Sequence, residues 1–311
     1  MPFSSDRLWA KAKVYFERAI SSRDEGEFAL FQLWAALALE LLAKSTLANR
    51  NPVLLVDPRD TESLYVACGQ TKSTAVKTIP AHTVFERCRR LVSGFDDRDK
   101  NFCGEIFERR NGELHSALSP FEGVDIRSWQ SRFWRIVKLL AEDQKKDLGA
   151  LLGRKEAKEA REMVSGAARA LEVAIRARID RKRSSFISRN PSAPPRLLEQ
   201  LRTHARITTQ ARLDDSSSSG TCPSCGCDGL LTGSAIEEHE AEARYEEPPD
   251  QHTPGGTFVV IETVCETEGF ECFVCGLRLD SAEEIEIAGL PAEFVTTREK
   301  DYEYEEEYGN D

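Results

Sequence analysis

An arginine and a histidine separated by four residues form the first group that could carry out chemistry. Arg110 and His115 stand at the two ends of this spacing, just before an aromatic-rich segment. A histidine can transfer a proton near neutral pH, and an arginine can hold a phosphate group in its planar fork. Together they are sufficient for metal-free cleavage of RNA, in which the 2′-hydroxyl attacks its own phosphate. Because this spacing is common by chance, the surrounding sequence must decide whether the two residues are functional.

Two alternatives to this interpretation stay open. Arg110 can instead pair with a carboxylate such as Glu113 or Glu40 while His115 forms a hydrogen bond in the core, which would make both residues structural. Arg109 is a second arginine, with five residues between it and His115. On an ideal helix Arg110 is rotated by about 140° from His115, so a long side chain or a distorted helix would have to bring the two together.

Four cysteines form a second chemical group. They lie in two C-x-x-C-G segments, residues 222–226 and 272–276, separated by a segment that alternates like a strand. Four thiolates can complete a tetrahedral sulfur shell, which suits zinc and leaves no open position for catalysis. The predicted ligands of this structural zinc are Cys222, Cys225, Cys272 and Cys275. Cys227 is an alternative to Cys225, whereas His239 and His252 are not expected to be ligands.

Charge is distributed unevenly along the 311 residues, whose net charge is −11. Residues 1–150 carry 23 Lys/Arg against 21 Asp/Glu, residues 151–213 carry 15 against 6, and residues 214–311 carry 4 against 26. The net charges of the three parts are +2, +9 and −22. The basic part is either a solvated helix face or a surface that contacts phosphate or docks onto the acidic end of the chain.

No segment of the sequence looks like an export signal or a membrane span. The first residues lack the basic start and the long apolar run of a signal peptide. The longest apolar stretch, residues 33–43, contains Glu40 and is too short to cross a bilayer. We therefore expect a cytoplasmic protein without membrane contact, whose C-x-x-C cysteines bind metal rather than form disulfides.

Hydrophobic periodicity predicts a mostly α fold with an antiparallel helical bundle over residues 1–150. The second helix, about residues 25–48, is apolar nearly all round and should be central in the bundle. The other helices of the bundle are expected over residues 5–22, about 60–68, from Pro80, about 100–115, and 126–148.

The rest of the chain is predicted to contain a connector, a metal domain and a tail. Residues 151–213 read as a basic helical connector, and residues 214–220, which contain four serines, read as a flexible linker. Residues 221–290 are expected to form a small β zinc ribbon with an acidic insertion at 237–250. Residues 291–311 are expected to be an acidic disordered tail.

The first 150 residues resemble the HEPN superfamily (higher eukaryotes and prokaryotes nucleotide-binding). One part of the resemblance is the segment from Leu39 to Lys44, followed by Asn51-Pro52; the stronger part is R-N-x-x-x-H-S from Arg110 to Ser116, before a helix with Trp129, Phe133 and Trp134. Residues 272–279 and 282–289 look like the zinc-ribbon ends of some bacterial members.

This resemblance implies a helical bundle that forms a homodimer in which the motifs of two chains face each other. Many members are metal-independent endoribonucleases of defence, toxin or RNA-processing systems, and a regulatory protein partner is conceivable in such systems. Carried over to this chain, Arg110 would hold the scissile phosphate of an RNA, and His115 would act as general acid or base. Asn111 would orient the imidazole or the substrate, and the product would end in a 2′,3′-cyclic phosphate.

The alternative function is a non-catalytic HEPN and zinc-ribbon protein that binds RNA or another protein, since some members of the superfamily have lost activity. Charge favours this alternative, because residues 214–311, with a net charge of −22, repel nucleic acid. The acidic tail could also shield the basic segment until a partner displaces it. Deletion of residues 294–311 should then increase RNA affinity at low salt.

Overall fold

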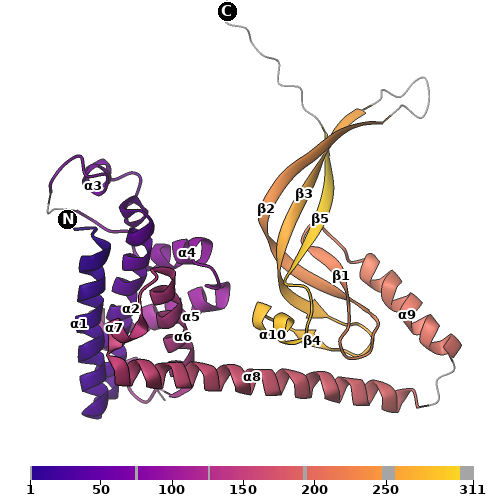
Figure 1. Cartoon of the computed structure of the whole chain (residues 1–311), viewed down its shortest axis with the longest axis horizontal. Helices are drawn as coiled ribbons and strands as arrows, with labels where there is room; N and C mark the ends of the chain where they lie inside the picture. Colours follow the sequence, from indigo (N-terminus) through magenta and orange to yellow (C-terminus); the bar gives the residue numbers. More distant parts are fainter. Residues whose placement is uncertain (1, 74–75, 125–126, 192–194, 247–255, 302–311) are drawn as a thin grey trace, which may run out of the picture. The chain divides into compact units, whose positions relative to one another are not determined.

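The computed structural model of the chain describes residues 2–73, 76–124, 127–191, 195–246 and 256–301. The chain divides into two compact units, Met1–Ala168 and Arg169–Asp311 (Figure 1). The first unit is helical, and the second contains an antiparallel sheet with helices around it. A mostly helical fold with a small C-terminal β region is therefore confirmed. The division falls inside the predicted basic connector, within one continuous helix.

The first unit is organised around α2 (Phe28–Arg50), which contacts the helices α1, α4, α5 and α6 and the 3₁₀ helix η1. This agrees with the central position expected from its apolar composition. The remaining helical elements of the unit are α1 (Ser5–Asp24), η1 (Pro52–Leu55), α3 (Thr61–Ala67), α4 (Ala81–Leu91), α5 (Asp97–His115), α6 (Arg127–Asp143), α7 (Leu148–Leu152) and the first part of α8 (Arg154–Arg189).

An aromatic cluster joins α1, α2 and α6 in the core of this unit. The ring of Trp129 on α6 stacks on Phe31 of α2 with ring centroids 5.6 Å apart, and it meets Phe133 edge-on at 4.9 Å. Phe133 in turn lies against Phe16 of α1 at 6.3 Å. Such rings each bury a large apolar area, so the aromatic segment that follows the Arg–His motif serves mainly as core.

α5 begins with a capping box, in which Asp96 and Asp99 each accept a hydrogen bond from the other's backbone N–H. These bonds satisfy amide groups that the first turn of a helix leaves without partners. The helix then continues to His115, so the whole Arg–His motif lies in its last two turns. Its predicted helical setting is thus found, with a start three residues earlier than the sequence indicated.

By length and composition α2 could cross a membrane, which the eleven-residue apolar stretch in the sequence did not suggest. Half of its most apolar window is buried inside the unit. Core helices of globular proteins have the same properties. The bundle contacts of α2, together with the ion pairs of its Glu40, are those of a core helix.

The second unit contains a five-stranded antiparallel sheet with the strand order β1-β2-β3-β4, and β5 also pairs with β3, on the edge opposite β2. The strands are β1 (Ser217–Thr221), β2 (Asp228–Glu246), β3 (Gly256–Glu271), β4 (Arg278–Leu279) and β5 (Glu293–Asp301). Two further helices, α9 (Pro195–Gln210) and α10 (Ala282–Ile287), contact β2 and β3 respectively. The core of the unit includes Ile175 and Ile179 from the second part of α8.

Three segments that the sequence predicts to be irregular are strands. The expected linker 214–220 instead enters β1, which pairs with β2 from Ser217↔Thr232 to Thr221↔Asp228. The expected acidic insertion is strand as far as Glu246, and the expected tail forms β5 up to Asp301, where Phe294 is buried. Residues 247–255 and 302–311 lie outside the described residues. Pairing with β2 and β3 outweighs the polar composition of these segments.

Candidate functional site

The two C-x-x-C-G segments form matching turns. In the first turn the amide of Gly226 donates to the carbonyl of Cys222 at 3.0 Å, and in the second turn Gly276 donates to Cys272 at 2.9 Å. Both glycines have left-handed backbones, with φ of +71° and +70°. Glycine adopts this conformation without steric cost, which explains the residue after each second cysteine.

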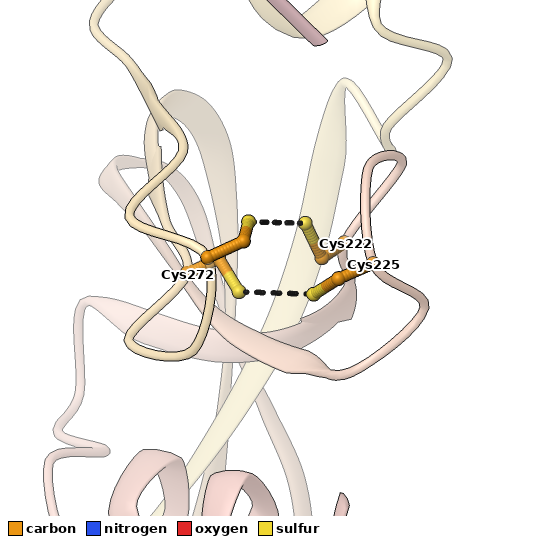
Figure 2. A group of neighbouring side chains, drawn as sticks. Cys222, Cys225 and Cys272 are labelled. Atoms are coloured by element: carbon orange, nitrogen blue, oxygen red, sulfur yellow. Dashed lines mark hydrogen bonds between the residues drawn. The ribbon is translucent and has the colours of Figure 1, made fainter. Parts of the chain in front are cut away.

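The sulfur atoms of the two turns face each other across a short gap (Figure 2). The Sγ atoms of Cys222 and Cys275 are 3.6 Å apart, and those of Cys225 and Cys272 are also 3.6 Å apart. All four sulfur atoms lie within 4.8 Å of one another. A tetrahedral zinc with Zn–S bonds of about 2.3 Å needs sulfur atoms about 3.8 Å apart. The four cysteines can therefore hold a metal ion of this kind.

The thiols affect one another strongly. The hydrogen bond from Cys222 is the largest effect on Cys272, whose pKa is lowered to about 7, and it also lowers the pKa of Cys275. The hydrogen bond to Cys222 raises the pKa of Cys225. The pKa values of the four thiols are therefore shifted in opposite directions. A divalent cation would replace these protons and neutralise two of the four thiolate charges.

The other cysteines of the chain stand apart from this cluster. Cys227 is buried, and its Sγ lies 4.0 Å from the carbonyl of Cys225 rather than among the four sulfur atoms. Cys265 is buried in the sheet core, and Cys88 and Cys103 are buried in the helical unit. His239 is exposed and lies beside Glu237, while His252 is outside the described residues.

Two basic residues of α8 contact the cysteine turns, and the sequence analysis did not identify them. Arg183 donates hydrogen bonds to the carbonyls of Pro223 at 2.8 Å and Ser224 at 3.4 Å. The amino group of Lys182 lies 3.4 Å from the place that a Cβ on Gly276 would occupy. Arg183 thus holds the backbone of the first turn, and Lys182 lies close to the second. The basic run 181–183 was a signal for this role.

Arg110 is held by an ion pair inside the helical unit. Its Nη2 donates to Oε2 of Glu40 at 2.9 Å, and Oε1 of the same carboxylate lies 2.6 Å from Nζ of Lys44. The guanidinium also lies over the ring of Phe107, 4.6 Å from its centroid. Of the two carboxylates considered from the sequence, Glu40 is thus the partner, and Glu113 forms no ion pair with Arg110 among the described residues.

His115 and Asn111 occupy a different part of α5. Both side chains are exposed, and neither forms a hydrogen bond with a residue that the structure describes. The core hydrogen bond considered for His115 is therefore not found within that part of the chain. Arg109 lines a cavity with Trp129 and other residues and has no carboxylate partner in the described ranges.

The Arg–His motif and the cysteine cluster differ in how complete they are. The four sulfur atoms converge and form a donor set for a metal. Within the described residues no hydrogen bond joins Arg110, which is directed at Glu40, to the exposed His115. Comparison with protein-family models, with curated proteins and with solved structures finds no match for this chain.

Proposed function

We propose that the helical unit is a metal-independent endoribonuclease of HEPN type that acts as a homodimer. The observation that carries the proposal is the exposed pair Asn111 and His115 in the last turns of α5, with no partner in the described part of the chain. An imidazole in this setting is available to a substrate. On the same helix, Arg110 donates through Nη2 to Glu40, while its Nη1 has no hydrogen-bond acceptor among the described residues.

The reaction would need one group to remove a proton and another to supply one. The imidazole of one His115 would take the proton of the 2′-hydroxyl, and this oxygen would attack the phosphorus. The leaving 5′-oxygen would receive a proton from the His115 of a second chain. Arg110 would stabilise the charge on the phosphate through Nη1. The products would be a 2′,3′-cyclic phosphate and a 5′-hydroxyl.

A homodimer is part of the proposal for a geometric reason. Arg110 and His115 are about 140° apart around an ideal helix, so one chain does not present both to one phosphate. Two α5 helices that meet at their C-terminal turns would bring an arginine of one chain to the histidine of the other. Exposed Leu114 and Leu118 lie in and just after these turns and offer apolar surface for such a contact.

The test is cleavage of total RNA and of structured RNAs by the metal-loaded protein, without added divalent ions. His115→Ala should lower the rate by about 10²–10⁴-fold, the usual contribution of a general acid or base. His82→Ala is the matched control, because His82 is an exposed histidine on α4 of the same unit. Arg109→Ala and Arg110→Ala, tested separately, identify the arginine that contacts phosphate. A folded, dimeric wild type without cleavage would contradict the proposal.

A second candidate function is a non-catalytic module that binds RNA or protein. The ion pairs of Glu40 with Arg110 and Lys44 favour it, because they neutralise these cations within the chain. This candidate predicts RNA or protein binding that His115→Ala does not change. The regulatory role of the acidic end is best tested by deletion of residues 302–311. Deletion from residue 294, as expected from the sequence, would also remove most of β5.

For the second unit we propose a structural zinc ion bound by Cys222, Cys225, Cys272 and Cys275. Its support is the all-sulfur donor set, with the four sulfur atoms within 4.8 Å of one another, which suits zinc better than hard cations such as magnesium. Four thiolates leave no position for a substrate, so the ion would stabilise the fold. The proposed setting of both units is cytoplasmic, where thiols stay reduced.

A further inference from the structure

A cavity of about 250 Å³ lies beside α5 in the helical unit and is separate from the Asn111–His115 face. Five of its lining residues are apolar or aromatic, and three are polar. The lining consists of Gln32, Phe102, Glu105, Ile106, Arg109, Phe121, Val124 and Trp129. Because Glu105 is exposed, the cavity reaches the protein surface.

Two donors of this lining have no acceptor among the described residues. The indole Nε1 of Trp129 is buried without a hydrogen-bond partner, and only 8% of this residue is exposed. The guanidinium of Arg109 has neither an ion pair nor a hydrogen bond to a described residue, although Glu105 is one helical turn away. A buried donor without an acceptor is costly, so a site that leaves one free is suited to a ligand that accepts it.

The amide nitrogen of Gln32 is a donor that forms its hydrogen bonds within the protein. Its Nε2 already donates to the carbonyls of Phe28 at 3.3 Å and Phe121 at 3.2 Å. These bonds hold the loop residue Phe121 against α2, so hydrogen bonds within the protein fix this wall of the cavity. Gln32 itself is 2% exposed. The cavity therefore combines an apolar wall with two donors that have no acceptor in the described part of the chain.

We propose that this cavity binds a planar aromatic ring that carries an anionic group. The ring would lie among Phe102, Phe121 and Trp129, and the anion would pair with Arg109. An acceptor atom of the ligand would accept a hydrogen bond from Trp129 Nε1. A dry cavity of about 150 Å³ holds one benzene ring in another protein, so about 250 Å³ leaves room for one or two fused rings and an acidic group.

Two classes of small molecule have these features: aromatic carboxylates and nucleoside monophosphates. Both combine a planar ring with an anion and with acceptor atoms. The proposal shares Arg109 with the arginines considered for the ribonuclease, but it does not rest on cleavage, because it uses neither His115 nor Asn111. His115→Ala should bind every probe as the wild type does, which keeps failure of one proposal distinguishable from failure of the other.

The test is calorimetric titration of the full chain with indole-3-acetate and, separately, with AMP and UMP. Indole-3-acetamide, adenosine and inorganic phosphate are the matched probes that lack either the charge or the ring. Arg109→Gln should weaken binding of a charged ring by roughly tenfold or more, the effect of losing a charge-assisted hydrogen bond. Arg7→Gln, at an exposed arginine of α1, should change nothing.

Two further variants test the two other polar contacts. Glu105→Gln should tighten binding by roughly twofold to tenfold, because it removes a negative charge at the rim of the cavity. Trp129→Phe keeps a ring but removes the donor, so it should weaken binding of ligands that have an acceptor. Thermal unfolding of each variant shows whether the unit is intact.

The results separate support from failure. Binding by the carboxylate alone, or by the nucleotides alone, supports the site and identifies the source of its ligand. Absence of binding by all charged rings to the folded wild type overturns the proposal. So does equal binding by Arg109→Gln and wild type, or equal binding of inorganic phosphate and the charged rings.

Discussion

The carboxylate of Glu40 on α2 holds the guanidinium of Arg110 on α5, with 2.9 Å between Oε2 and Nη2. Its other oxygen holds Lys44 at 2.6 Å. One carboxylate thus neutralises two cations, and all three side chains are at most 17% exposed. The pair joins two helices through residues that are 70 positions apart in the sequence. It also fixes the position of the arginine in the Arg–His motif.

Because Glu40 serves two cations, we expect Glu40→Gln to destabilise the helical unit more than Arg110→Gln does. Glu40→Gln leaves Arg110 and Lys44 near each other without a carboxylate, at a cost of about 1–3 kcal/mol in the free energy of unfolding. Arg110→Gln leaves Glu40 still paired with Lys44 and should cost less. Denaturant unfolding followed by circular dichroism measures both values.

The exposed pair Lys138–Glu142 on α6 serves as the control for this comparison. Glu142→Gln should change the free energy of unfolding by less than about 0.5 kcal/mol, since surface ion pairs contribute little. If Arg110→Gln proved at least as destabilising as Glu40→Gln, the shared carboxylate would not be the main stabilising group. The packing of Arg110 over Phe107 would then matter more.

Local patterns predicted much of this molecule, and long-range pairing explains what they missed. The apolar residues of α2 indicated a central helix, and the spacing of Cys222, Cys225, Cys272 and Cys275 indicated a sulfur cluster. The partner of Arg110 could not be predicted in this way. The sequence left Glu113 and Glu40 both open as the partner of Arg110, and only the packing of α5 against α2 decides between them.

The missed strands have the same explanation. Residues 216–219 are four serines, a composition typical of linkers, yet the ladder with Leu230 and Leu231 of β2 makes them an edge strand. The first residues of the expected tail alternate, with Phe294 buried and Val295 exposed, which is a strand pattern that the acidic composition concealed. Such edge strands depend on their neighbours more than on their own residues.

The cysteine cluster gives a sharp test of ligand identity. Cys275→Ser should abolish or strongly weaken zinc binding, whereas Cys227→Ser should retain one zinc ion per chain. Metal content after dialysis and the absorption of the cobalt-substituted protein measure this difference. Loss of the ion should also reduce the stability of the sheet, because a structural zinc contributes about 10–16 kcal/mol of binding free energy in small zinc domains.

The two variants differ only in where the sulfur lies. Cys227 is buried beside the cluster but points toward a carbonyl, so it controls for the loss of a nearby thiol. A zinc ion that survives Cys225→Ser and is lost in Cys227→Ser would assign the fourth ligand to Cys227 in place of Cys225. It would also require a different arrangement of the first turn.

The thiols of the helical unit should differ greatly in reactivity. Burial raises the pKa of Cys88 to about 12 and raises that of Cys103 well above its ordinary value, whereas Cys68 is exposed. The thiolate is the nucleophile, so at about pH 8 the two buried thiols stay protonated as well as enclosed. Iodoacetamide should therefore modify Cys68 alone among these three cysteines in the native protein.

Peptide mass spectrometry at increasing reaction times measures this labelling. In guanidinium chloride all three thiols should react, which controls for the detection of each peptide. Raising the pH should accelerate labelling of Cys68 and leave Cys88 unmodified until the pH nears its pKa or the unit unfolds. Rapid native labelling of Cys88 or Cys103 would show that α4 and α5 separate readily.

Two glycine substitutions should have opposite effects because the two backbones differ. Gly276 has a φ of +70° in the second cysteine turn, so Gly276→Ala places a Cβ in a left-handed conformation at a cost of about 1–2 kcal/mol. Gly166 lies in α8, where an added Cβ meets nothing within 4 Å. Gly166→Ala should stabilise that helix by about 0.5–1 kcal/mol.

The two variants should affect different units of the chain, and this difference is the decisive comparison. Gly276→Ala should lower zinc affinity, measured by competition with a chelator, and Gly276→Asn should lower it less, because asparagine tolerates the left-handed region. Gly166→Ala should leave zinc affinity unchanged and raise the unfolding temperature of the helical unit. Equal zinc affinity for wild type and Gly276→Ala would mean that the turn adapts around the ion, and that the sulfur atoms rather than the backbone determine the site.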